Sequence, residues 1–307
     1  MTARIYLTEN CNASCPWCFN KGTRDPTLNM DTERAKKLFD WFSKNGVEEI
    51  LVMGGEPTIH PDFIELWNYI HRKGMYARLF TNGKEIDKIN QIEISPRDSI
   101  IYNFDFISFP VKKELFYHFC NYRFEVVLRK QTDVVKLIEK INMIHQFEIE
   151  HHMQFRYNIT PDCTENWFNE KELLNDKLRE LLNYARKNRT IFWSWDHAYP
   201  ICLFDKDVID LIYGMLNTGG VNHCSGQEGC VGLVTSNFNL VHCNQYRNVK
   251  LPLIKEDGNF ISYKEAENFL YFENLHKIES LRNSSCANCK YFRIWCNGGC
   301  IAHKFNH

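Results

Sequence analysis

Three cysteines near the start of the chain have the spacing of ligands that share one metal centre. They stand in Cys11-Asn-Ala-Ser-Cys15-Pro-Trp-Cys18, three and then two residues apart. Thiolates select soft metals, chiefly zinc and iron–sulfur clusters. Three thiolates hold three irons of a [4Fe–4S] cube and leave the fourth iron open to another ligand. Because zinc sites usually close with four protein ligands and no fourth lies nearby in sequence, the spacing favours a cluster.

A second group of cysteines crowds the last third of the chain. Seven of the 13 cysteines fall there, in a chain of 307 residues. No export signal precedes them, so their density indicates metal ligands rather than disulfides. Zinc ribbons also use paired cysteines, and the spacing by itself leaves zinc open. The seven are Cys224, Cys230, Cys243, Cys286, Cys289, Cys296 and Cys300. We expect the other three, Cys120, Cys163 and Cys202, to be small buried residues.

Short apolar runs alternate with amphipathic segments through the first half, which is typical of repeated βα units. Such units favour a parallel sheet, open or curled into a partial barrel, with the chemistry at the carboxyl ends of the strands. The predicted strands are Ile5–Leu7, Ile50–Met53, Ala77–Phe80, Phe104–Phe109, Phe124–Leu128 and His152–Tyr157. The predicted helices are one capped by Asp31 and ended by Gly46, then Pro61–Lys73, Lys112–Asn121, Asp133–His145 and Lys171–Asn188.

The length favours two domains. After Asn188 the helical periodicity weakens, glycine becomes frequent and the cysteines crowd together. We therefore place a boundary between about residues 190 and 202. This divides the chain into an α/β domain, residues 1–190, and a small cysteine-rich domain, residues 191–307.

Composition excludes several classes of partner. A net charge of −1 and the lack of a Lys/Arg run argue against nucleic acid. No apolar stretch approaches the length of a membrane span. The start of the chain is too short and too soon charged for a signal peptide. The sequence predicts a cytoplasmic protein of a reducing, oxygen-poor compartment.

Two motifs together resemble those of radical S-adenosylmethionine (SAM) enzymes. The first is the cysteine motif, with the aromatic Trp17 before its third cysteine, and the second is the turn Gly54-Gly55-Glu56-Pro57 after the second strand. The resemblance covers roughly residues 3–160 and implies a partial (β/α)6 TIM-like barrel. In that family the open iron chelates the methionine part of SAM. The turn is expected to expose backbone and a carboxylate to the methionine ammonium, its glycines permitting the close approach.

The resemblance implies further SAM contacts. Ser108, ending the predicted fourth strand, sits where relatives place a ribose-binding Ser or Asn, and Arg129, ending the fifth, where many place an Arg for the SAM carboxylate. An ordinary strand-end hydroxyl and a surface arginine are the alternatives. The segment Thr81-Asn82-Gly83 is a turn whose position fits a loop close to the adenosine.

The C-terminal cysteines resemble the SPASM extension, which holds two auxiliary [4Fe–4S] clusters. The resemblance assigns Cys224, Cys230, Cys243 and Cys300 to the first cluster, and Cys286, Cys289 and Cys296 to the second. The sequence departs from the pattern: the interval after Cys289 is one residue longer, and no cysteine follows Cys300. The second cluster is therefore open at one iron, ligated there by a residue such as His303 or His307, or absent, and we favour an open or non-cysteine site.

The resemblance implies reductive cleavage of SAM to methionine and a 5′-deoxyadenosyl radical, which abstracts hydrogen from the substrate. The leading substrate is a peptide or protein side chain, to be oxidised, cross-linked or epimerised. We expect no leader-recognition domain to be fused to this chain, so that a separate protein would recognise a leader peptide. Asn244 replaces the carboxylate of sulfatase-maturing relatives, which argues against sulfatase oxidation. Flavodoxin or ferredoxin is the expected reductant. The alternatives are a small-molecule dehydrogenase or epimerase acting on a sugar or cofactor precursor, and a non-enzymatic zinc-binding or electron-carrying module.

Overall fold

The structure is a computed structural model. It describes residues 1–15, 18, 20, 22, 24–106, 121–145, 154–159, 167–188, 201–215, 230–242, 247, 249–273 and 284–290. The chain divides into two compact units, residues 1–122 with 226–279 and residues 123–225 with 280–307. The predicted division near residue 190 stays a prediction.

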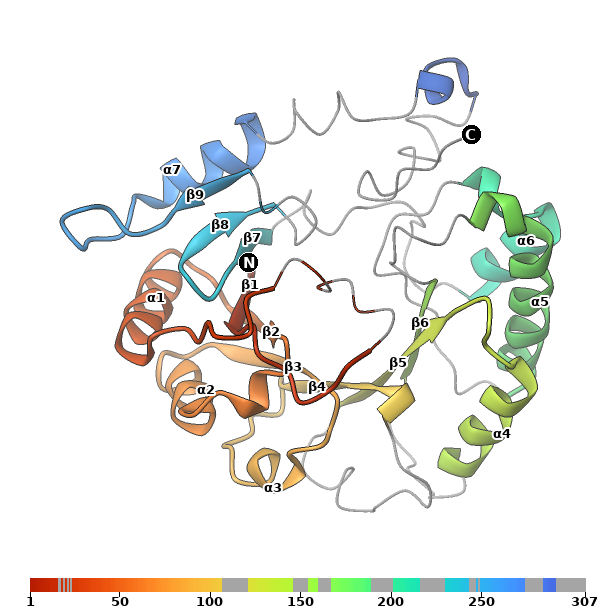
Figure 1. The fold of residues 1–307 in the computed structure, drawn as a ribbon, viewed down its shortest axis with the longest axis horizontal. Coiled ribbons are helices and arrows are strands. Elements are labelled where there is room, and N and C mark those ends of the chain that lie inside the picture. The colour runs from red at the N-terminus through yellow and green to blue at the C-terminus, as the bar shows by residue number, and fades with distance from the viewer. Residues whose placement is uncertain are drawn as a thin grey trace. The chain divides into compact units, whose positions relative to one another are not determined.

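The first unit is built on a sheet whose strand order is β4-β3-β2-β1-β7-β8-β9 (Figure 1). Strands β1 to β4 and β7 run parallel, and β8 and β9 are antiparallel additions. All the parallel strands therefore end at one edge, where their carboxyl-terminal loops meet. The strands are β1 (Thr2–Thr8), β2 (Glu49–Gly54), β3 (Tyr76–Thr81), β4 (Ser99–Asn103), β7 (Cys230–Val234), β8 (Asn239–Val241) and β9 (Lys250–Pro252).

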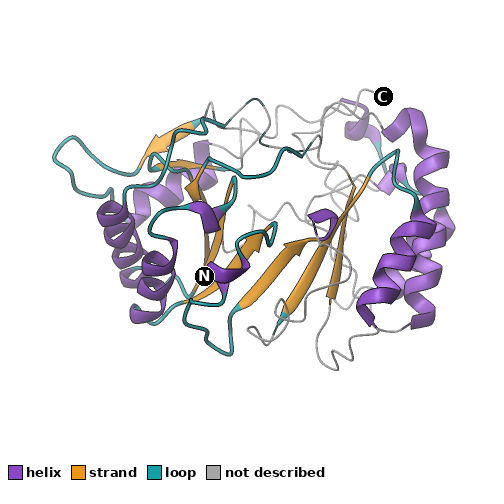
Figure 2. Ribbon diagram, turned by 60° about the horizontal axis from the view of Figure 1, so that its bottom comes forward, coloured by secondary structure: helices purple, strands orange, loops and turns teal. Residues whose placement is uncertain are grey.

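Helices α1 (Thr32–Lys44) and α2 (Phe63–Arg72) lie beside these strands (Figure 2). Asp31 caps α1 by accepting a hydrogen bond from the Arg34 backbone, as predicted, and Gly46 follows the helix with a φ of 76°. Apolar residues repeat on one face of each helix and are fully buried, which makes this face the core. They are Ala35, Leu38, Phe39, Phe42, Phe63, Leu66, Trp67 and Ile70. The short helix α3 (Ile86–Ile89) follows β3.

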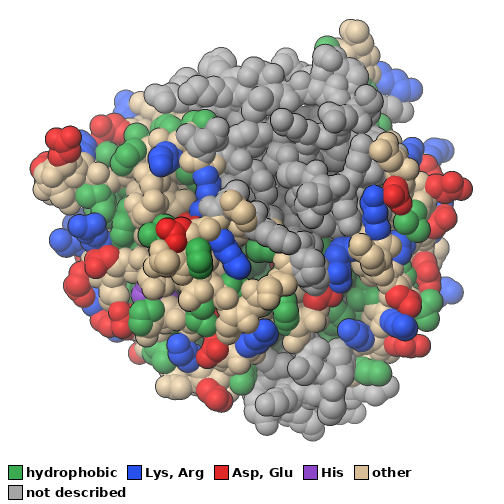
Figure 3. All heavy atoms as spheres, in the orientation of Figure 1, with side chains coloured by type: hydrophobic (Ala, Val, Ile, Leu, Met, Phe, Trp, Pro, Cys, Tyr) green, Lys and Arg blue, Asp and Glu red, His purple; other side chains and the backbone are tan. Residues whose placement is uncertain are grey.

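The second unit contains the parallel pair β5 (Tyr122–Leu128) and β6 (Gln154–Ile159). Its helices are α4 (Val134–His145), α5 (Lys171–Asn188) and α6 (Lys206–Met215). Asn175, fully buried in α5, donates to the carbonyl of Leu203 and accepts from the backbone of Asp205, which ties α5 to the start of α6. Within the described ranges no helix is both long and apolar enough to cross a bilayer. Side chains of both charges are interspersed on the face drawn in Figure 3.

The α/β class is confirmed, and parallel strands joined by helices are consistent with the predicted partial barrel. The fourth strand is corrected: β4 is Ser99–Asn103, whereas Phe104–Phe106 form a 3₁₀ turn. The physical reason is register, because Ser99 to Tyr102 pair with Arg78 to Thr81 and β4 ends level with β3. Ser108, residues 112–120 and His152 lie outside the described residues. Helices α6 and α7 (Tyr263–Asn268) and strands β7 to β9 were not predicted.

The C-terminal segment, by which we mean the part of the chain from β7 to Ile261, is joined to the N-terminal sheet. Strand β7 pairs in parallel with β1, so a strand of the predicted cysteine-rich domain (residues 191–307) extends the sheet that carries the cysteine motif. The indole nitrogen of Trp41 in α1 donates to the carbonyl of Ile261 at 2.9 Å, and its ring stacks on Phe260. The segment around β9 is therefore anchored on α1.

His60 makes stability depend on pH. It is buried, its Nε2 lies 2.9 Å from the Met30 carbonyl, and its Nδ1 accepts a hydrogen bond from the Asp62 backbone. Burial lowers its pKa below the ordinary 6.5, so the unfolded chain binds the proton more readily and stability falls as the pH drops below that value. We expect the difference in unfolding free energy between wild type and His60→Gln to shrink between pH 7.5 and 5. Urea denaturation at both pH values measures it; a constant difference would contradict the prediction.

Candidate active site at the carboxyl edge of the sheet

The cysteine motif and the glycine turn lie against each other. The motif begins three residues after β1 ends, and the turn begins with the last residue of the neighbouring strand β2. The backbone nitrogen of Gly55 donates to the Thr8 carbonyl and that of Glu56 to the Asn10 carbonyl, both at 2.8 Å. The residue before Cys11 is thus hydrogen-bonded to the turn, and the two motifs form one structure.

Only glycine fits at the first two positions of the turn. A Cβ on Gly54 would lie 2.2 Å from the Thr8 carbonyl oxygen, and one on Gly55 would lie 2.0 Å from that of Asn10. Gly54 also has a φ of 153°, a conformation that other residues rarely adopt. The glycines therefore permit close approach between the turn and the loop that carries the cysteine motif (residues 9–20, the cysteine loop). This is a packing role in addition to the expected approach to a ligand.

The carboxylate of Glu56 points into the protein, which corrects the expectation that the turn exposes it. Glu56 is only 1% exposed. It accepts hydrogen bonds from the hydroxyls of Thr58 and Thr81 at 2.6 and 2.8 Å, and from the backbone of Thr58 and Asn82. Burial raises its pKa, and the four donors oppose this rise. The Glu56 side chain thus links the turn to the end of β3. The groups that the turn can present to a ligand are therefore its backbone groups.

The loop after β3 continues this network to the cysteine motif. The side chain of Asn82 donates to the side-chain oxygen of Asn12 at 2.8 Å, and Lys84 Nζ donates to the Asn12 carbonyl at 2.9 Å. Asn12 in turn donates to Glu85 at 3.0 Å. The Thr81-Asn82-Gly83 turn therefore contacts Asn12, the residue directly after Cys11, and is part of the candidate site.

The three thiols of the motif have the chemistry of cluster ligands. Cys11, Cys15 and Cys18 are free and partly buried, and the Cys18 backbone donates to the Cys15 carbonyl at 3.2 Å. Burial, followed by the nearby Cys18 and Cys11, raises the pKa of Cys15 to about 11. Bound iron would reverse this effect by stabilising the thiolates.

The remaining predicted residues are only partly placed. Arg129 follows β5 as predicted, and its backbone donates to Thr132 at 2.9 Å. Cys230 begins β7. Cys286 lies in a short 3₁₀ helix, Ser284–Asn288, and is partly buried, whereas Cys289 directly follows this helix and is exposed. Cys202 is exposed, contrary to expectation. Trp17, Ser108, Cys120, Cys163, Cys224, Cys243, Asn244, Cys296, Cys300, His303 and His307 lie outside the described residues.

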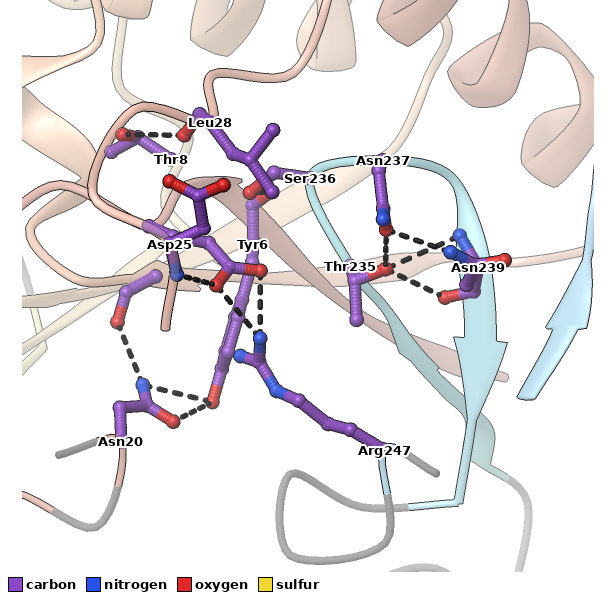
Figure 4. Close-up of polar contacts among 12 residues, drawn as sticks. Tyr6, Thr8, Asn20, Asp25, Leu28, Thr235, Ser236, Asn237, Asn239 and Arg247 are labelled. Atoms are coloured by element: carbon purple, nitrogen blue, oxygen red, sulfur yellow. Dashed lines mark hydrogen bonds and ion pairs between the residues drawn. The ribbon is translucent and has the colours of Figure 1, made fainter. Parts of the chain in front are cut away.

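A buried group that sequence reasoning missed borders the cysteine loop (Figure 4). Arg247 Nη1 lies 2.7 Å from both carboxylate oxygens of Glu9, which is 3% exposed. Its guanidinium lies 5.2 Å from the centre of the Tyr6 ring. Tyr6 and Asn20 are joined by long hydrogen bonds of 3.4–3.5 Å. The available signal was Glu9, a charged residue directly after an apolar strand.

The chain is thus an α/β protein whose parallel sheet carries three thiols and a glycine turn at its carboxyl edge. Together these groups form a candidate site for a metal cluster and a ligand. Residues 5–112 match the Radical SAM superfamily, and this part of the chain is a radical SAM domain.

Segments of known proteins resemble this domain. The PqqA peptide cyclase of Ruegeria pomeroyi is 35% identical over 78 residues, covering 25% of this chain and 21% of that protein. The GTP 3′,8-cyclase of Haemophilus ducreyi is 33% identical over 90 residues, covering 28% and 26%. The chain thus matches only about a quarter of the length of these curated relatives.

The fold is shared over a longer range. SuiB of Streptococcus suis, in its SAM-bound crystal structure, has a TM-score of 0.63 and 15% identity, covering 98% of this chain and 73% of that one. SuiB has also been solved with its precursor peptide SuiA. At 15% identity this likeness concerns the fold alone.

Proposed function

We propose that this chain is a radical SAM enzyme that reductively cleaves SAM and uses the resulting 5′-deoxyadenosyl radical to abstract hydrogen from a peptide. The observation that carries the proposal is the direct bonding of the cysteine loop to the glycine turn through Gly55 and Glu56. Cys11, Cys15 and Cys18 would hold a [4Fe–4S] cluster, which when reduced and bound supplies the electron for cleavage.

In this proposal the chain's own residues bind SAM and hold the cysteine loop in position. The turn offers backbone groups to the methionine end of SAM, since Glu56 is turned inward. The Asn82–Asn12 hydrogen bond holds the loop that carries the thiols. Arg129 and Ser108 remain proposed contacts for the SAM carboxylate and ribose. The reductant is a flavodoxin or ferredoxin.

A peptide substrate is favoured by a relative that is a peptide cyclase and by a shared fold with SuiB, which binds a precursor peptide. A separate leader-recognition protein would then be a partner. The second candidate is a small-molecule substrate, favoured by the similarity to a GTP 3′,8-cyclase.

The test is an anaerobic incubation of the reduced, iron-loaded chain with SAM and a short peptide encoded beside its gene. The function predicts 5′-deoxyadenosine, and a peptide that loses hydrogens or gains deuterium in heavy water. Cys15→Ala supplies the background. SAM cleavage with an unchanged peptide favours the small-molecule candidate, whereas iron-loaded protein that leaves SAM intact contradicts both.

The C-terminal cysteines are proposed to hold one or two auxiliary [4Fe–4S] clusters in a SPASM-like domain. Iron and sulfide counting tests this separately: roughly twelve irons per chain fit three cubes, and roughly four leave only the SAM cluster. Appreciable zinc would contradict the auxiliary assignment.

A further inference from the structure

We propose that Arg247 is a positioning residue through which the C-terminal segment fastens the cysteine loop at the point where it leaves β1. Arg247 lies four residues after Cys243, whereas its partner Glu9 lies two residues before Cys11. The ion pair therefore joins the segments proposed to carry the auxiliary and SAM clusters. The proposal rests on the proposed function for what the loop binds.

The geometry is that of a buried, charge-assisted contact. Arg247 Nη1 lies 2.7 Å from each oxygen of Glu9, and the two side chains are 18% and 3% exposed. Glu9 Oε2 also accepts a hydrogen bond at 3.0 Å from the backbone of Asp25, which follows Cys18, the last cysteine of the motif. Glu9 thus bridges the residues before and after the cysteine motif, and Arg247 neutralises it. Removing one member of such a pair leaves an uncompensated buried charge.

The same guanidinium reaches the far end of the loop through Tyr6. It lies over the Tyr6 ring, whose hydroxyl meets the side chain of Asn20, two residues after Cys18. Asn20 also donates to the Gly54 carbonyl at 3.4 Å. Burial raises the pKa of Tyr6 to about 12, so this ring remains a neutral phenol that supports the cation on its face. Figure 4 shows Arg247 beside Tyr6, whose hydroxyl meets the side chain of Asn20.

Arg247 is thus suited to limit opening of the loop at both ends. Ion pairing restrains the entry and packing on Tyr6 restrains the exit. Lysine would keep the charge but lose the planar contact with the ring and the fork of donors. The thiols should therefore be more accessible when Arg247 is replaced, and a bound cluster should be held less uniformly.

The test compares full-length Arg247→Gln, Arg247→Lys, Glu9→Gln and the double variant with wild type. In iron-free protein we expect Arg247→Gln to speed alkylation of Cys11 and Cys18 about tenfold, and Arg247→Lys to have a smaller effect. The double variant, Glu9→Gln with Arg247→Gln, should speed alkylation much less than the product of the two single effects. In iron-loaded protein the EPR spectrum of the reduced cluster should broaden and its response to SAM should weaken.

The matched control is Arg78→Gln. Arg78 forms a partly buried 2.7 Å ion pair with Glu49 at the beginning of β2, the opposite end of that strand from the turn. It should lower the melting temperature and leave alkylation unchanged. Wild-type alkylation and EPR in Arg247→Gln, independent single effects, or equally fast alkylation in Arg78→Gln would each overturn the proposal. The alkylation rates do not depend on SAM cleavage, so failure of the proposed function is detected separately.

Discussion

Replacing Gly55 with alanine should lower the rate of SAM cleavage at least about 100-fold. The added Cβ would lie 2.0 Å from the Asn10 carbonyl oxygen and 2.8 Å from that of Glu9, so backbone must move. Asn10 directly precedes Cys11, and its displacement moves a proposed ligand of the cluster. Misplacement of reacting groups by about 1 Å is enough for a loss of that size. The measurement is formation of 5′-deoxyadenosine per iron-loaded chain.

The control for this variant is Gly74→Ala. Gly74 has a φ of 77°, yet a Cβ there would meet nothing within 4 Å. Alanine should cost about 1–2 kcal/mol of stability through backbone strain and leave SAM cleavage close to wild type. If Gly55→Ala retained the wild-type rate, the turn would not position the cysteine loop.

Replacing Glu56 with alanine should destabilise the protein by about 2–6 kcal/mol and release the cysteine loop. The change leaves the backbone amides of Thr58 and Asn82 buried without their acceptor, at about 1–3 kcal/mol each. It also frees Asn82, whose side chain holds Asn12. Glu56→Gln should lie between, because an amide still accepts from Thr58 and Thr81 but turns a donor toward the Asn82 backbone. Urea denaturation and SAM affinity by equilibrium dialysis measure the two effects.

Asp98→Ala separates stability from function. Asp98 is fully buried and accepts from the backbone of Ala77 and Ser95 at 2.7 and 2.6 Å, near the beginning of β3. Its loss should cost a similar amount of stability while SAM affinity persists. Equal loss of SAM affinity in both variants would show that Glu56 acts only through global stability.

Strong local signals allowed much of the N-terminal fold to be predicted. Helix α1 begins after the Asp31 cap, and α5 has the predicted bounds Lys171–Asn188, because apolar periodicity and capping are local properties. The error at β4 arose where Phe104 and Phe106 continue an apolar run beyond the strand. Pairing with β3 decides where that run stops being a strand, and pairing is not a local property.

The sequence by itself determined the chemical groups of the site: three thiols at fixed spacing and a Gly-Gly-Glu-Pro turn. The tertiary structure decided what surrounds them. Hydrogen bonding at the ends of β2 and β3 turned the Glu56 carboxylate inward, because the donors of Thr58, Thr81 and Asn82 are brought together only by the fold. Likewise, Arg247 reaches Glu9 across 238 residues of sequence because β7 pairs with β1. Spacing along the chain encodes ligand sets, whereas contacts between distant segments depend on the packing of the whole sheet.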